Sequence, residues 1–104
     1  MIIATTETLV GYEIARSLGM ARGSTVRAKH IGSDIVASLR NLVGGEVHEY
    51  ARLLAGAREQ ATDRMIEDAR QMGADAVVCV RMQTSSISSG NSEILVYGTA
   101  VKLK

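Results

Sequence analysis

A long amphipathic stretch runs from Glu46 to Met72 and limits the folds that this chain can adopt. Apolar residues recur in it at spacings of three and four, which predicts one helix with a single apolar stripe. The stripe consists of Val47, Tyr50, Ala51, Leu54, Ala57, Ala61, Met65, Ala69 and Met72. Gly73 follows directly, where a left-handed residue commonly ends a helix. At ~1.5 Å per residue the helix is roughly 40 Å long, more than the diameter of roughly 35 Å expected for a compact domain of this size.

A helix of this length favours one domain, residues 1–104, that associates with further copies. Splitting 104 residues would leave pieces too small to form a core without metals or disulfides. The core must consist of small aliphatic side chains, because the chain has three Tyr and neither Phe nor Trp. Each absent ring would bury on the order of 150–250 Å². Since self-association can supplement a small core, we expect a homo-oligomer.

Shorter elements are predicted before and after the long helix. We expect a strand over residues 1–5, a helix over residues 12–18 stopped by Gly19, a strand over residues 23–30, and a second helix from Asp34 to the pair Gly44 and Gly45. Later come a strand over residues 76–82, a Ser-rich linker over residues 85–92 with a hairpin tip at Gly90 and Asn91, and a strand over residues 93–102.

These elements predict an α+β fold with a small antiparallel sheet, which includes the C-terminal hairpin, and helices on one side. The last strand is apolar on both faces, with Leu95 and Tyr97 on one and Ile94 and Val96 on the other. Strands of this kind are usually covered on both sides. One long helix covers a single face, so we expect the opposite face to meet a neighbouring subunit.

Charge and cysteine content exclude several classes of function. The net charge is +1 with acids and bases interleaved, which argues against nucleic acid or anionic membrane as a partner. No apolar run approaches the ~20 residues that span a bilayer. Cys79 is the single cysteine, and the start MIIATT has neither a basic region nor a long apolar region of a leader. We therefore expect a cytoplasmic protein.

Metal ligands are present but scattered. His30, His48 and Cys79 lie far apart in the sequence, whereas soft metal ions prefer clustered ligands. Cys79 stands in an apolar run, where a free cysteine usually acts as a small core residue. An oligomer can still gather one ligand from each subunit around an axis, so a metal site across subunits stays an alternative.

Arg58 is the most informative charged residue, because a helical wheel places it inside the apolar stripe. There it would either bind a carboxylate or phosphate ligand or pair with an acid of the same or the next subunit. Arg40, just before Gly44 and Gly45, could likewise bind an anionic ligand or pair with an acid. The exposed amides of the two glycines can also hold an anion. On the opposite helix face Glu59, Asp63 and Glu67 form an acidic ridge that is most simply solvated.

No nucleophile assembly is recognisable. The Ser and Thr residues do not fall in a G-x-S-x-G motif, and no phosphate-loop motif is present. The sequence therefore gives little support to an enzyme, and no cofactor is expected.

Several segments in order resemble the YbjQ-like family of small uncharacterised bacterial and archaeal proteins, often labelled a heavy-metal-binding domain. The residues that carry the resemblance are Thr5, Thr6, Thr8, Asp34, Arg40, Gly44, Gly45, Tyr50, Ala57, Arg58, Ala61, Gly73, Ala74, the run from Ala76 to Val78 and the run from Gly98 to Val101. The resemblance implies a β-α-β-β core, a dodecin-like subunit with extra short strands that assist assembly, and a pentameric ring. The heavy-metal label brings no ligand cluster that transfers residue by residue onto this sequence.

The leading hypothesis is a homo-oligomeric, pentameric binding or structural protein that accepts a small ligand at clefts between subunits. Arg40, Gly44, Gly45, Tyr50 and Arg58 are the candidate ligand-binding residues. The first alternative is a heavy-metal-binding protein that uses His30, His48 or Cys79 across subunits. The second is an enzyme acting on a small polar or phosphorylated substrate.

Overall fold

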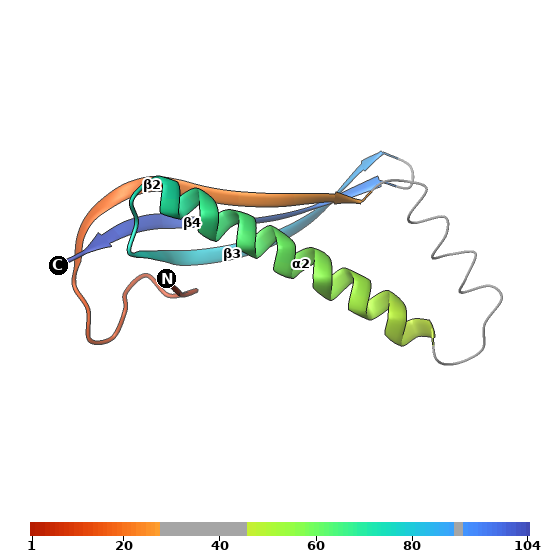
Figure 1. Ribbon diagram of the computed structural model, residues 1–104, viewed down its shortest axis with the longest axis horizontal. Helices are drawn as coiled ribbons and strands as arrows, with labels where there is room; N and C mark the ends of the chain where they lie inside the picture. The colour runs from red at the N-terminus through yellow and green to blue at the C-terminus, as the bar shows by residue number, and fades with distance from the viewer. Residues whose placement is uncertain (28–45, 89–90) are drawn as a thin grey trace.

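The computed structural model describes residues 1–27, 46–88 and 91–104, and for residues 27, 46–54, 86–88 and 91–92 it describes the backbone alone. Its elements are β1 (Ile2–Ile3), β2 (Ile14–Arg27), α2 (Glu46–Gln71), β3 (Ala76–Ser88) and β4 (Asn91–Leu103). Within these residues one helix lies against a four-stranded sheet (Figure 1). The predicted α+β class and the long helix are confirmed.

The strands are ordered β1-β3-β4-β2. β4 pairs antiparallel with β3 on one side and with β2 on the other. β1 pairs parallel with β3, with Ile2 opposite Ala76 and Ile3 opposite Val77. The sheet is therefore mixed: the predicted antiparallel hairpin is confirmed, and the prediction of an antiparallel sheet is wrong for β1. The chain order β2-α2-β3-β4 is the β-α-β-β core, with β4 inserted between the two strands that α2 connects.

The helix predicted over residues 12–18 is wrong, because these residues lead into and form the first part of β2. Long-range pairing with β4 overrides the local helical pattern. Gly19 is not a helix cap: it has a positive φ of 119° next to a register shift between Ser17 and Gly19. The irregularity marks a β-bulge, which disturbs the period of two that would have indicated a strand. The helix predicted from Asp34 to Gly45 lies outside the described residues.

The C-terminal hairpin is longer than predicted. β3 continues to Ser88 and β4 begins at Asn91, so the segment interpreted as a Ser-rich linker is mainly strand. Ser86 lies opposite Ser92 in the ladder. Backbone pairing does not require apolar side chains, and antiparallel strands can carry polar residues where they face water. The predicted tip residue Gly90 lies outside the described residues.

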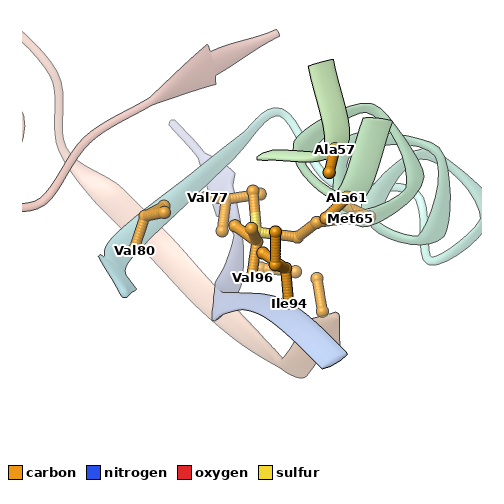
Figure 2. Packing of buried hydrophobic residues seen from close by; sticks show 10 residues of the cluster. Ala57, Ala61, Met65, Val77, Val80, Ile94 and Val96 are labelled. Atoms are coloured by element: carbon orange, nitrogen blue, oxygen red, sulfur yellow. The ribbon is translucent and has the colours of Figure 1, made fainter. Parts of the chain in front are cut away.

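α2 packs on one face of the sheet through small side chains. Ala57, Ala61, Met65 and Ala69 are fully buried, and Met65 extends toward Val77 and Val96 of the sheet (Figure 2). Gly23 of β2 makes the close approach possible, because a Cβ there would collide with the backbone of Ala61, Arg64 and Met65. The helix therefore touches β2 almost backbone to backbone.

The C-terminus of α2 ends as the sequence predicts. Gly73 has a φ of 83°, its amide donates to the carbonyl of Arg70 at 2.9 Å, and the amide of Ala74 donates to the carbonyl of Ala69 at 3.1 Å. These two bonds form a Schellman motif, which satisfies carbonyls that the helix leaves unpaired.

The sheet face opposite α2 is covered only at one end in the described residues. There Ala76, Val78 and Val101 pack with Ile2 and Leu9 of the N-terminal segment. Farther along the same face, Met20 and Val26 of β2 are 57% and 58% exposed. The prediction that the helix covers one face is confirmed, and the described residues leave much of the other face uncovered.

Candidate functional site

Arg58 is exposed on α2, next to the fully buried Ala57. The prediction that it lies inside the buried stripe is wrong for the single chain. The stripe that faces the sheet runs strictly through Ala57, Ala61, Met65 and Ala69. Because alanines let the backbones approach closely, this contact is narrow, and a residue 100° away around the helix already reaches solvent.

Arg58 lines an open pocket of about 330 Å³ between α2 and β3. Glu59, Thr62 and Asp63 of α2 and Met82 of β3 complete its lining. The Thr62 hydroxyl donates to the carbonyl of Arg58 at 2.8 Å, and Met82 is 56% exposed. The Arg58 guanidinium suits an anionic group of a small polar ligand, whereas the carboxylates of Glu59 and Asp63 would repel that group and suit a cationic or hydroxyl group instead.

The described lining of this pocket can be compared with no other predicted ligand residue, because none of the others has a described side chain. Arg40, Gly44 and Gly45 lie outside the described residues. Tyr50 belongs to α2, but only its backbone is described. It lies eight residues before Arg58 along the chain, which is about 12 Å along a helix axis.

The residues considered for a metal are not gathered within the described part of the chain. Cys79 lies at the irregularity in β3 between Val78 and Arg81, with a φ of 55°, and packs against the cluster formed by Ala76, Val78 and Val101. His48 belongs to the backbone-only part of α2, and His30 lies outside the described residues. Among residues whose side chains are described, no group of three or more His, Cys, Asp or Glu is placed to hold a metal ion.

The acidic ridge is exposed, and one member is paired. Arg70 Nη1 lies 3.4 Å from Glu67 Oε2, and both side chains are more than half exposed. Such a pair contributes little to stability. The ridge borders the pocket of Arg58 at Glu59 and Asp63.

A second open pocket, of about 340 Å³, lies where α2 meets β2. Its lining residues are Arg22, Arg64, Glu67, Asp68 and Gln71. The amide of Arg22 donates to Asp68 Oδ2 at 2.9 Å, and Arg64 Nη1 donates to the carbonyl of Ser24 at 2.6 Å. Sequence reasoning missed these contacts because their partners are 40 or more residues apart and share no local pattern.

No helix in the described part of the chain is long and apolar enough to cross a membrane.

The whole chain, residues 1–104, matches a family model, YbjQ, described as "Putative heavy-metal-binding". It is similar to a UPF0145 protein of Methanosarcina acetivorans, with 61% identity over 99% of this chain and 97% of that protein. A UPF0145 protein of Archaeoglobus fulgidus is 54% identical over 100% of this chain and 96% of its own length. A solved structure from Pediococcus pentosaceus, titled a protein of unknown function of the DUF74 family, shares the fold with a TM-score of 0.65 at 13% identity and covers 100% of this chain and 98% of its own.

Proposed function

Because the chain belongs to the YbjQ family of UPF0145 proteins, we propose that it works as a cytoplasmic homo-oligomer, a pentameric ring of dodecin-like subunits that binds a small polar ligand between subunits. The observation that carries this proposal is the open sheet face opposite α2. Two further observations support the proposal: the edge of β3 from Met82 onward, with which no described strand pairs, and the pocket that contains Arg58.

The open face suits a second copy of this chain. Met20 and Val26 are each more than half exposed, and the neighbouring Leu95 and Tyr97 of β4 are half-buried. Covering apolar surface releases ~25 cal/mol per Å². A chain with few large core side chains gains stability when it buries apolar surface against a partner. A second copy of the same chain is a partner that is always present.

One edge of the sheet also offers unpaired backbone. The N-terminal segment covers the start of β3, where the amide of Val80 donates to the carbonyl of Ala4 at 3.0 Å and the amide of Cys79 donates to the carbonyl of Thr6 at 3.0 Å. From residue 82 onward, no described residue pairs with this edge of β3. Residues 82–88 carry no charge and no proline that would oppose an added strand.

Light scattering coupled to size-exclusion chromatography tests the assembly. A pentamer has a mass of about 55 kDa, five times the 11.1 kDa of the chain. That mass, constant over a hundredfold range of concentration, is the expected result. A stable species of about 11 kDa would refute the oligomer and with it the sites between subunits.

The ligand site rests on the pocket of Arg58, whose lining residue Met82 lies where the unpaired edge of β3 begins, so a neighbouring subunit at that edge would border the pocket. We expect phosphate or small carboxylic acids to raise the melting temperature of the wild-type protein, because a ligand that binds only the folded state stabilises it. Arg58→Ala should abolish this shift. Arg70→Ala is the matched control, since Arg70 lies on the same helix, is exposed and does not line the pocket. Equal shifts in all three proteins would remove Arg58 from the site.

The family description favours a second candidate function, the binding of a heavy metal by ligands from several subunits. His30, His48 and Cys79 are the residues that would provide imidazole and thiolate ligands. Elemental analysis of protein purified without a tag tests this function. One metal ion or more per oligomer, lost in the His30→Ala, His48→Ala and Cys79→Ala triple variant, would support it. Less than one ion per oligomer would contradict it.

A further inference from the structure

β2 is an edge strand, because it pairs with β4 on one side and with no described strand on the other. Its outward edge is a ready template for a strand from another molecule, since the outward N–H and C=O groups lack ladder partners. α2 lies directly against this strand at Gly23, where a Cβ would collide with the helix backbone. The helix is therefore close enough for its side chains to reach the edge.

Two side chains of α2 bond to that edge. The amide of Arg22 donates to Asp68 Oδ2 at 2.9 Å. The carbonyl of Ser24 accepts a bond from Arg64 Nη1 at 2.6 Å. In an antiparallel strand every second residue turns both backbone groups to the same side, so Arg22 and Ser24 are consecutive outward positions. Both contacts join a charged group to a backbone group, which makes them stronger than neutral hydrogen bonds.

We infer that Asp68 and Arg64 form an edge lock, a pair of side chains that occupies the outward N–H of Arg22 and the outward C=O of Ser24 and prevents another strand from adding to this part of β2. An acceptor and a donor four residues apart on one helix match a donor and an acceptor two residues apart on one strand. An incoming strand would have to break both charged contacts before it could pair. The edge lock leaves surfaces other than the β2 edge for association between chains. The inference does not depend on the number of subunits in the assembly.

The test compares two double variants that each remove one acid and one arginine from α2. Arg64→Ala with Asp68→Ala removes the lock. Glu67→Ala with Arg70→Ala removes an exposed ion pair of the same helix that bonds to no strand. The two double variants have the same net charge, so a difference between them cannot come from a change in net charge. The readouts are the mass distribution by light scattering, thioflavin fluorescence during incubation, and hydrogen exchange of the Arg22 amide by NMR.

The lock variant is expected to form species larger than the wild-type mass and to raise thioflavin fluorescence, while the control variant matches the wild type. Exchange of the Arg22 amide should accelerate tenfold or more in the lock variant, and that of the Ala21 amide, which faces β4, should stay slow. A lock variant with the wild-type mass distribution at every concentration would overturn the inference, even if exchange accelerates.

Two further measurements guard against a variant that merely unfolds. Asp68→Asn keeps an acceptor oxygen, so it should fold, keep the Arg22 amide protected and stay at the wild-type mass. In the wild-type protein itself the Arg22 amide should be protected although it faces away from the ladder. Rapid exchange of that amide in the folded wild type would contradict the edge lock without any substitution.

Discussion

Gly23→Ala is the substitution that most sharply tests how α2 is seated on the sheet. The added methyl group would lie against the carbonyl oxygen of Ala61, the carbonyl carbon of Arg64 and the amide nitrogen of Met65. These are backbone atoms, which cannot rotate aside as a side chain does. The helix must therefore move away from β2, and the fully buried Met65 loses part of its packing.

The magnitude follows from this geometry. Overpacking of a dense core costs about 1–3 kcal/mol. The upper end applies here, because the collision is with a helix backbone, so we expect a loss of about 3 kcal/mol. For a domain of this size 1 kcal/mol corresponds to a change in melting temperature of about 4–8 °C, which predicts a decrease of roughly 12–24 °C.

Thermal and urea unfolding, followed by circular dichroism at one fixed protein concentration, measure the effect. Gly56→Ala is the matched control, since it is the same chemical change within α2 at a position where a Cβ meets nothing within 4 Å. It should stabilise the protein by about 0.5–1 kcal/mol, because alanine is the better helix former. A Gly23→Ala protein within about 0.5 kcal/mol of the wild type would refute the close packing of α2 on β2.

Three further substitutions test separate parts of the fold. Met65→Ala should cost about 2–5 kcal/mol in urea unfolding, because its fully buried side chain would leave a cavity; a loss below 1 kcal/mol would contradict its central place in the core. Gly73→Ala should cost about 1 kcal/mol through its positive φ, and an unchanged melting temperature would contradict the Schellman motif. The hydrogen bond from the Leu103 amide, aided by Lys102, lowers the pKa of Asp75 in the folded protein. The ionised Asp75 carboxylate therefore stabilises the fold at pH values above its pKa in the unfolded chain. This stabilisation is lost as the pH falls through the pKa of the folded state. Asp75→Asn should flatten the decline in unfolding free energy below about pH 4, and an acid titration equal to that of the wild type would contradict this contact.

The long helix was predictable because its signal is local and sustained. The spacing of Ala57, Ala61, Met65 and Ala69 needs no knowledge of distant contacts, and Gly73 marks the end by backbone preference alone. The two C-terminal strands were recognised for the same reason. Their true length was not, since the serines near the hairpin tip pair through their backbones.

β2 and the details of the site depend on long-range contacts that no local pattern records. In the sequence Gly19 looks like the cap of a helix. In the structure its positive φ belongs to a bulge in β2, where the strand shifts register against β4. Arg58 was found as a candidate but misplaced, because the width of the buried stripe depends on how closely α2 meets the sheet. The bond from the Arg22 amide to Asp68 joins positions 46 residues apart, so only the folded chain reveals it.

If another copy of the chain covers the sheet face opposite α2, a charge placed on that face must change the mass of the assembly, and the Met20→Glu variant places one there. Met20 is 57% exposed on that face in the single chain, and a buried unpaired carboxylate is costly. Gln60→Glu, which adds the same charge on an exposed position of α2, is the control. Light scattering should find the control at the wild-type mass and Met20→Glu as a folded species of about 11 kDa, the mass of one chain. Met20→Glu at the full wild-type mass would contradict coverage of that face by another copy.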